Sequence, residues 1–255
     1  MKIDREQELL KYLYVSQKMT LEQAMETLGI SESTARRLFS RLEQHHLAIR
    51  THGGIQCIGS TIDSYSFEKG SHANIEQKTR IGKKACELIE DGDVVFCDSG
   101  TTIRCFCSSL ILHLKKNKIN VRFYTNSLAN MDILSPHMEV NLIGGRYRAN
   151  RKDFCGYIAD QAMNGLYFSK CFLGADGYTP DSRFTTTDFE TANIAETAIR
   201  NSKQSFLLVD SSKFSTASHI AYSPAENFKA VITDNGIPSD IRNELNRQGC
   251  RVILA

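Results

Sequence analysis

The sequence predicts an α/β protein with two domains, a small helical one followed by a larger one built on a largely parallel sheet. Its 255 residues exceed one small module. From residue 77 to the C-terminus, strand-like apolar runs alternate with helical patterns, which is typical of a parallel sheet. The stretch Cys57–Ser66 is rich in Ser, Thr and Gly and lacks helical periodicity. We therefore expect a first domain at 1–57, a linker at 58–75 and a second domain at 76–255.

The composition excludes several classes of protein. Charged residues make up 24% and hydrophobic residues 41%, near globular averages, which excludes wholesale disorder. The net charge of +2 excludes a histone-like charged surface but not a local basic patch. Eight Cys without a C-x-x-C pair predict neither a disulfide framework nor a zinc site, and they favour a reducing, cytoplasmic location. We expect no metal and no cofactor. The charged start and the lack of an apolar run of ~18 residues predict neither a signal peptide nor a membrane span.

Three helical patterns fill the first domain. The second begins at Thr20 with Gln23 three residues on, the spacing of a capping box that satisfies backbone donors at a helix start. Apolar residues at i, i+3, i+4 and i+7 line the second and third patterns, at 21–28 and 35–42. Ser31 can cap the third helix. Because a glycine-containing turn joins these two short helices, they predict a helix-turn-helix unit.

The third helix and the segment after it carry the features of a DNA contact surface. Residues 33–54 hold four Arg against one Glu. The second helix of such a unit places side chains on base edges in the major groove, where Arg can bond guanine. Short apolar runs around Gly53 and Gly54 indicate a β-hairpin, hence a winged variant whose Arg50 could reach phosphate. The expected DNA-binding residues are Thr20, Ser31, Ser33, Thr34, Arg36, Arg37, Ser40, Arg41, Arg50, His52 and Gly53.

Seven strands are expected in the second domain, and polar residues follow five of them. The strands are expected at Val94–Cys97, Asn120–Tyr124, Glu139–Ile143, Cys171–Leu173, Phe206–Val209, Ala230–Thr233 and Arg251–Leu254. Ligands of such sheets bind beyond the carboxyl ends of the strands. Cations and N–H groups at a helix start suit a phosphate, and carboxylates suit sugar hydroxyls. The predicted sugar-phosphate site comprises Asp98, Ser99, Gly100, Thr101, Thr102, Thr125, Asn126, Ser127, Gly144, Gly145, Arg146, Asp176, Gly177 and Lys213.

These motifs resemble the DeoR family of bacterial sugar-metabolism repressors over nearly the whole chain. In the first domain the likeness rests on Arg5, Leu9, Ser31–Arg37 and Arg50–Gly54. In the second domain it rests on Asp98–Thr102, Thr125–Ser127, Gly144–Gly145, Gly174–Gly177, Thr185–Thr186 with Asp188 and Glu190, Asp210–Phe214 and Ile232–Asp234. The resemblance adds Thr186, Asp188 and Glu190 to the expected effector site. The chain departs from the family pattern at Leu38, at Ser182 with Arg183, and at Ala195.

The resemblance also implies a fold and a function. The fold is an N-terminal winged helix-turn-helix domain plus a larger C-terminal α/β sensor domain similar to ribose-5-phosphate isomerases and coenzyme A transferases. The function is a repressor of a carbohydrate-utilisation operon that binds double-stranded operator DNA and is released by a phosphorylated sugar. A homo-oligomer, dimer or tetramer, is also implied.

Three alternatives stay open at this stage. A sugar-phosphate isomerase-like enzyme would need Asp176 or Glu190 as a base, but Thr179 stands where related isomerases have a second Asp, so we expect no catalysis. A redox or metal sensor would use the cysteines near the site, although such cysteines are more often buried apolar residues. These cysteines are Cys97, Cys105 and Cys107. The arginine-rich helix face could instead be a solvated surface of an interaction domain.

Overall fold

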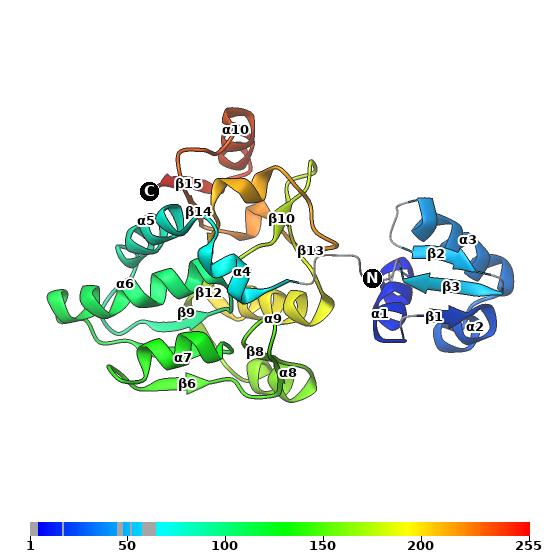
Figure 1. The fold of residues 1–255 in the computed structure, drawn as a ribbon, viewed down its shortest axis with the longest axis horizontal. Coiled ribbons are helices and arrows are strands. Elements are labelled where there is room, and N and C mark those ends of the chain that lie inside the picture. Colours follow the sequence, from blue (N-terminus) through cyan, green and yellow to red (C-terminus); the bar gives the residue numbers. More distant parts are fainter. Residues whose placement is uncertain (1–4, 17, 45–47, 52, 58–64) are drawn as a thin grey trace. The chain divides into compact units, whose positions relative to one another are not determined.

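The chain folds into two compact units, Met1–Ser64 and Tyr65–Ala255 (Figure 1). The computed structural model describes residues 5–16, 18–44, 48–51, 53–57 and 65–255. None of the helices within these ranges has the length and apolar character needed to cross a membrane.

The first unit is a winged helix-turn-helix, as predicted. Its elements are α1 (Arg5–Ser16), β1 (Lys18–Thr20), α2 (Leu21–Leu28), α3 (Glu32–Gln44), β2 (Ala48–Thr51) and β3 (Gly54–Cys57). The capping box at the start of α2 is confirmed, because the Gln23 amide donates to Thr20 Oγ1 and the Thr20 amide donates to Gln23 Oε1. Gly29 ends this helix with φ +58, a conformation that glycine adopts easily. β2 and β3 form the expected wing, and β1 adds an antiparallel strand that was not predicted.

The core of the first unit comes from the predicted apolar stripes. Side chains that are fully buried there include Leu9, Leu13, Ala24, Ala35, Leu42 and Ile55. Leu38, the departure from the family pattern, is only 5% exposed and belongs to the same core. The residue at this position therefore stabilises the fold by burial and is not part of the polar surface of α3.

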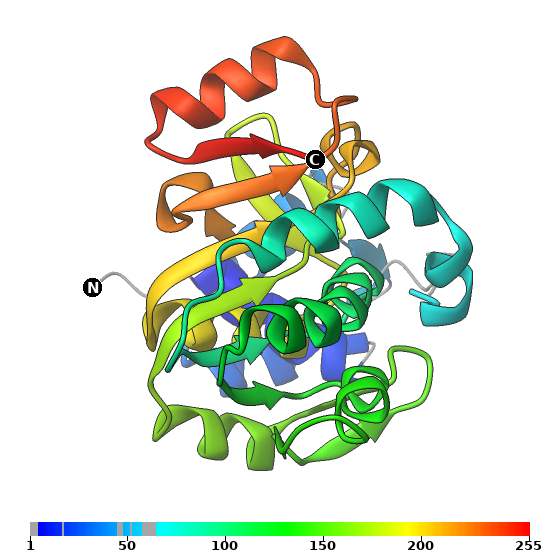
Figure 2. The same cartoon turned by 90° about the vertical axis from the view of Figure 1, so that its left-hand side faces the viewer.

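The second unit is a three-layer α/β/α structure on a seven-stranded sheet (Figure 2). The strands, in spatial order, are β15 (Arg251–Leu254), β14 (Ala230–Thr233), β12 (Ser202–Leu208), β9 (Phe168–Leu173), β4 (Val94–Cys97), β5 (Arg122–Thr125) and β6 (Val140–Leu142). Each neighbouring pair is parallel. All seven strands of the prediction are present, so the parallel α/β class is confirmed.

Helices cover both faces of this sheet. They are α5 (Ile75–Cys86), α6 (Thr101–Asn117), α7 (Leu128–Leu134), α8 (Tyr157–Asn164), α9 (Phe189–Arg200) and α10 (Ser239–Arg247). The first three pack on one face through a core that contains Ile81, Phe106 and Phe172. On the other face α9 contacts β9 and β12. Ala195, another departure from the family pattern, is buried on α9, where a longer polar side chain would meet the core.

Short elements complete the second unit. They are the hairpin β7 (Arg146–Arg148) and β8 (Asp153–Cys155), the antiparallel sheet β10 (Gly177–Tyr178), β11 (Arg183–Thr186) and β13 (Ile220–Pro224), and the 3₁₀ turns η1 (Ser211–Phe214) and η2 (Ala225–Asn227). The sequence did not reveal these strands, because two to five residues carry too little periodicity to distinguish a strand from a turn.

The second unit includes residues that were expected to belong to the linker at 58–75. Residues 65–75 belong to the second unit and contain α4 (Phe67–His72). Phe67 is 3% exposed, and its amide donates to the Asn150 carbonyl. The segment is therefore fixed to the second unit by burial and hydrogen bonding, although its composition resembles a linker.

Glycine 82 sets the spacing between α5 and α6. A Cβ atom at Gly82 would lie 2.6 Å from the Phe106 amide nitrogen and 2.7 Å from the Cys105 carbonyl carbon, both of which are backbone atoms. We expect Gly82→Ala to lower the free energy of unfolding by about 1–3 kcal/mol, because the helices must separate. Urea unfolding followed by circular dichroism measures this. Gly165→Ala, at a site with no atom within 4 Å, is the control, and equal effects of both would contradict the explanation.

Candidate effector pocket and DNA-binding surface

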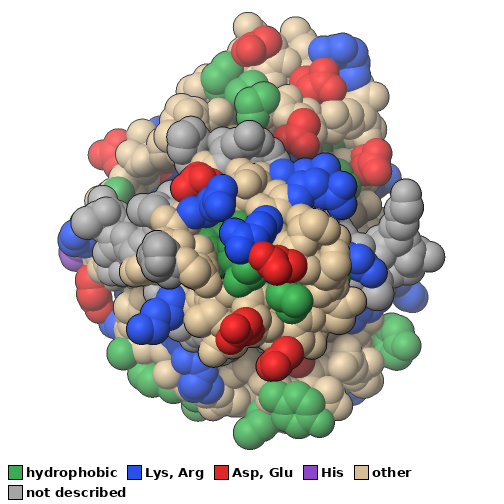
Figure 3. Space-filling model, turned by 90° about the vertical axis from the view of Figure 1, so that its right-hand side faces the viewer, with side chains coloured by type: hydrophobic (Ala, Val, Ile, Leu, Met, Phe, Trp, Pro, Cys, Tyr) green, Lys and Arg blue, Asp and Glu red, His purple; other side chains and the backbone are tan. Residues whose placement is uncertain are grey.

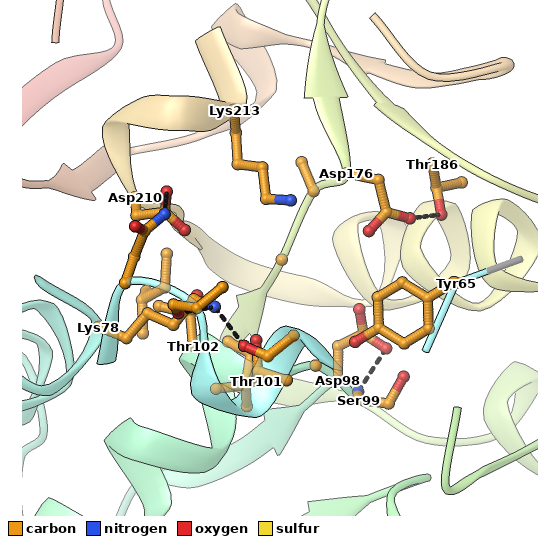
Figure 4. A pocket seen from close by; sticks show the side chains of 18 of the residues that line it. Tyr65, Lys78, Asp98, Ser99, Thr101, Thr102, Asp176, Thr186, Asp210 and Lys213 are labelled. Carbon is orange, nitrogen blue, oxygen red and sulfur yellow. Dashed lines mark hydrogen bonds between the residues drawn. The ribbon is translucent and has the colours of Figure 1, made fainter. Parts of the chain in front are cut away.

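A cavity of about 130 Å³ lies at the carboxyl end of the sheet in the second unit (Figure 4). Eight of the predicted effector residues line it: Asp98, Ser99, Gly100, Thr101, Thr102, Asp176, Thr186 and Lys213. They come from the turn after β4, the start of α6, the turn after β9, strand β11 and η1. The parallel sheet thus brings together side chains that are up to 115 positions apart in the sequence, from 98 to 213.

One end of the cavity is formed by the start of α6. This helix has 17 residues, and no side chain in the described part of the chain caps it. Its N-cap, Gly100, has φ +131, which residues with a Cβ atom rarely adopt. Uncapped N–H groups and the helix dipole give such an N-terminus a partial positive charge. This end of the cavity can therefore bind an anion.

Two lysines stand at the same end. The Lys213 side chain extends from η1 into the cavity (Figure 4), and no hydrogen bond or ion pair is recorded for it among the described residues. Lys78, 3% exposed, donates from Nζ to the Gly70 and Ala73 carbonyls, each at 2.7 Å. Burial lowers the pKa of Lys78 below its usual value. A bound phosphate would add the countercharge that these groups lack.

Carboxylates form the other end. Asp98 is 3% exposed and accepts a hydrogen bond from the Ser99 amide at 2.6 Å. Burial raises the pKa of Asp98 to about 7, with nearby Asp153 adding to the rise. Asp176 accepts hydrogen bonds from Thr186 Oγ1 at 3.0 Å and from the Thr187 amide at 3.2 Å. Both carboxyl groups can bond to neutral hydroxyls.

Nine predicted effector residues do not line the cavity. They are Thr125, Asn126, Ser127, Gly144, Gly145, Arg146, Gly177, Asp188 and Glu190. Thr125, Asn126 and Ser127 are buried, and Ser127 Oγ caps α7. Their strand-end position is right, but β5 lies beside β4 and further from the cavity than β9 and β12. The hydroxyls of Thr125 and Ser127 therefore serve the turn and the start of α7, and the Asn126 side-chain amide donates to the Phe154 carbonyl of β8.

Two of the three glycines and the remaining charged residues have structural roles. A Cβ atom at Gly145 would lie 2.6 Å from the Cys155 carbonyl oxygen, and one at Gly177 would overlap the Thr216 carbonyl. Gly144 has open space around it. Arg146 is exposed and bonds to Glu190. Asp188 caps α9, and its carboxylate is 2.7 Å from Nη1 of Arg148.

The cavity also contains residues that sequence reasoning missed. They are Tyr65, Gly70, Ala73, Asn74, Lys78, Ile103, Arg151, Gly174, Ala175, Thr191, Leu208, Asp210 and Ser212. Several of them come from the segment expected to be a linker or from α5, which precedes the first strand of the sheet. Gly174, Ala175, Asp210 and Ser212 lie in strand-end motifs that the sequence did single out, so that signal could have found them. Nothing in the sequence marks Tyr65 or Arg151.

On the first unit, the predicted DNA-binding residues lie mainly on α3 and the wing. Arg36 is exposed, and its Nε donates to Glu32 Oε1 at 2.8 Å. Arg37 is exposed, with no recorded partner among the described residues. Arg50 fixes the wing to α3, because its Nη1 donates to Ser40 Oγ at 3.2 Å and its amide donates to Glu43. Lys and Arg side chains on this face are mixed with Asp and Glu (Figure 3).

The other predicted contacts have local roles as well. Thr20 forms the capping box, and Arg41 is 3.9 Å from Glu6. The Ser31 hydroxyl meets those of Ser33 and Thr34 at the start of α3. Gly53 has φ +84 in the wing turn, and its carbonyl accepts from the Leu21 amide. His52 lies outside the described residues.

The cysteines give no support to a redox or metal sensor. Cys97 and Cys107 are fully buried and Cys105 is 8% exposed. Burial raises the pKa of Cys97 and of Cys105, so their thiols stay protonated and unreactive. Within the described ranges, no group of three or more His, Cys, Asp or Glu side chains is placed to hold a metal ion.

A helix-turn-helix unit followed by an α/β unit with a polar pocket defines a ligand-responsive DNA-binding regulator. The DeoR-like helix-turn-helix domain matches residues 5–61, and the DeoR C-terminal sensor domain matches residues 73–235. The chain belongs to the DeoR family of transcriptional regulators.

Individual relatives agree with this family. The chain is 36% identical over 238 residues to the lactose phosphotransferase system repressor of Lactococcus lactis subsp. lactis, covering 91% of each. It is 29% identical over 258 residues to the HTH-type transcriptional regulator IolR of Bacillus subtilis (strain 168), covering 100% of each. A ribose-5-phosphate isomerase A from Methanocaldococcus jannaschii matches with 17% identity and a TM-score of 0.41, covering 56% of this chain and 55% of that one. The names of these two relatives point to a transcriptional regulator and not to an enzyme, in line with the family.

Asp98 makes stability depend on pH. Its pKa of about 7 in the folded chain exceeds the value near 3.9 of an unfolded aspartate, so the folded state binds the proton more tightly. The contribution of this carboxyl group to the free energy of unfolding is fully present below about pH 4 and is lost as the pH rises through about 7. Asp98→Asn has no such loss, and we expect it to gain up to about 4 kcal/mol relative to wild type across this range.

Urea unfolding of both proteins between pH 4 and 8 measures the difference. Asp240→Asn, at an exposed carboxyl, is the matched control and should stay parallel to wild type. If the free energies of unfolding of wild type and Asp98→Asn ran parallel over this pH range, the pKa of Asp98 in the folded chain would be that of an ordinary aspartate, and the explanation would be wrong.

Proposed function

We propose that the chain represses a carbohydrate-utilisation operon and that a phosphorylated sugar in the cavity releases it from operator DNA. The observation that carries this proposal is the polarity of the cavity. Its α6 end, with Lys213, suits a phosphate, and its other end, with Asp98 and Asp176, suits sugar hydroxyls. A relative of similar length is a lactose phosphotransferase system repressor, which supports an effector from carbohydrate metabolism.

The partners follow from the same proposal. Helix-turn-helix proteins commonly bind two half-sites about 10–10.5 bp apart, or multiples of that, as dimers. We infer that the chain acts as a homo-oligomer, a dimer or a tetramer, on double-stranded operator DNA in the cytoplasm. In this proposal the residues of α3 and the wing contact DNA, and those of the cavity contact the effector.

The direct test is operator binding with and without phosphorylated sugars. Fluorescence anisotropy would follow binding of the purified chain to the DNA upstream of its own gene at fixed salt. We expect saturable, sequence-specific binding that one sugar phosphate weakens. Binding no tighter than to random DNA would contradict the proposed operator binding. Specific binding that responds to no member of a broad panel would contradict the proposed effector.

Arg37 is the arginine of α3 most available to DNA. Its neighbour Arg36 is engaged with Glu32, whereas no partner of Arg37 is recorded in the described part of the chain. We expect Arg37→Ala to weaken operator binding by ~5- to 100-fold, the effect of losing one good base or phosphate contact. Arg80→Ala, at an exposed arginine of α5, is the control. Unchanged affinity of Arg37→Ala in anisotropy titrations would remove Arg37 from the DNA contact set.

Lys213 is expected to bind the phosphate. Lys213→Ala should leave operator affinity intact and weaken effector binding by ~10- to 100-fold, because a charge-assisted hydrogen bond in a buried site is lost. Isothermal titration calorimetry gives the effector affinity, and anisotropy gives the operator affinity. Lys203→Ala, at an exposed lysine of β12, should change neither. An unaltered effector response in Lys213→Ala would place the phosphate elsewhere.

A further inference from the structure

The chain enters the second unit through the wall of the effector cavity. The division between the units falls after Ser64, and Tyr65 is therefore the first residue of the second unit. Tyr65 lines the cavity, as do Gly70, Ala73 and Asn74 further along the same segment. The covalent connection to the DNA-binding unit thus begins at a side chain that faces the cavity.

Tyr65 lies at the carboxylate end. Its ring is beside Asp98 and Asp176 (Figure 4), and the Arg151 guanidinium carbon lies over it, 3.9 Å from the ring centroid. Burial raises the pKa of the Tyr65 phenol, so the side chain stays neutral. The Asn150 side-chain amide donates to the Tyr65 carbonyl at 3.3 Å. The ring contact with Arg151 and this long hydrogen bond therefore help to hold Tyr65.

The rest of the segment contacts the phosphate end. Gly70 lies so close to α6 that a Cβ atom there would be 3.3 Å from Thr101 Cγ2. Lys78 donates hydrogen bonds to the Gly70 and Ala73 carbonyls. The side-chain amide of Asn74 donates to the Asp210 carboxylate at 2.9 Å. Residues 65–74 therefore border both ends of the cavity, and the segment is firmly fixed from the buried Phe67 onward.

The cavity is small for the ligand proposed above. Its volume of about 130 Å³ is less than half of the ~300 Å³ at the lower limit of typical small-molecule sites. The walls from β4, β9 and α6 belong to the packed core, so they cannot yield easily. The Tyr65 ring belongs to the segment that borders the cavity and is held there by its contact with Arg151. Arg151 beneath it is 5% exposed, and its Nε has no hydrogen-bond partner among the described groups.

We propose that the sugar end of the effector displaces the Tyr65 ring from Arg151, and that this displacement transmits occupancy of the cavity to the DNA-binding unit. The inference rests on the proposed function and assigns it a coupling residue. Sugar hydroxyls replace the ring against Arg151, Asp98 and Asp176. Burial of Phe67 and the contacts at the phosphate end keep the remainder of the segment in place, so the change is directed along the chain toward the first unit.

The test compares three full-length variants with wild type. Operator affinity is measured by anisotropy with and without ligand, and ligand affinity by calorimetry. The probes are ribose 5-phosphate, fructose 1-phosphate, fructose 6-phosphate and glucose 6-phosphate. For the probe that binds, we expect wild type to lose operator affinity by ~5-fold or more. Tyr65→Ala should bind the probe but change operator affinity less than ~2-fold, whereas Tyr65→Phe and the exposed-site control Tyr167→Ala should behave as wild type.

Each outcome bears on the proposal. If the probe changed the operator affinity of Tyr65→Ala by the same factor as that of wild type, the proposal would be overturned. Loss of probe binding in Tyr65→Ala, with operator binding intact, would make Tyr65 a binding residue only and would also overturn the coupling role. If wild type binds the operator but none of these probes or of a wider set of sugar phosphates, the proposed effector class fails, and this inference fails with it.

A spectroscopic measurement tests the displacement itself. The chain contains no tryptophan, so Tyr65→Trp would create a single reporter at the cavity wall. We expect its emission maximum to shift to longer wavelength when the bound probe moves the ring toward water. An unchanged maximum at saturating probe, in a variant that still binds the probe, would show that the ring stays in place.

Discussion

The turn from β4 into α6 is the constraint on which the site depends. β4 lies inside the seven-stranded sheet, and α6 is held against α5 by the close approach at Gly82. The helix start is therefore fixed at the carboxyl edge of the sheet. Asp98 precedes α6 by three residues, and Gly100 between them supplies the unusual backbone angle. One short turn thus places an anion-binding helix end and a buried carboxyl on the same cavity.

Charge pairing explains why the carboxylates behave differently from one another. Arg148 bonds to Asp153 and Asp188, each at 2.7 Å, and Arg151 lies 3.6 Å from Asp153, Asp176 and Asp188. These contacts pair Asp153 of the β7–β8 hairpin, Asp176 of the turn after β9 and Asp188, the N-cap of α9, with arginines. Burial would raise the pKa of Asp188, but Arg148 and Arg151 lower it below its usual value. Burial raises the pKa of Asp98, and no ion pair among the described residues offsets this rise. A ligand hydroxyl bonded to Asp98 would stabilise the charged form and recover part of that desolvation cost.

The sequence allowed both domains, all seven parallel strands and eight cavity residues to be predicted, because apolar runs and strand-end motifs are local signals. It could not predict which strand ends meet, since β5 follows β4 in the chain but leads away from the cavity. That arrangement is why Thr125 supports a turn, Asn126 bonds to β8 and Asp210 faces the cavity. Arg151 and Tyr65 were missed for a related reason. Their importance arises from contact between segments 86 positions apart, and neither lies in a recognisable pattern.

The position of Tyr65 also bears on the direction of signalling. A coupling between two ligands is a free energy shared by both, so an effector that weakens operator binding must itself bind more weakly to the operator-bound protein, by the same factor. In the coupling that we propose, the group that the effector displaces is the first residue of the second unit, which the chain joins to the DNA-binding unit. In this proposal, operator binding favours the state in which the Tyr65 ring lies on Arg151. The small cavity is then the state suited to operator binding, and enlarging it costs free energy that the sugar contacts must offset.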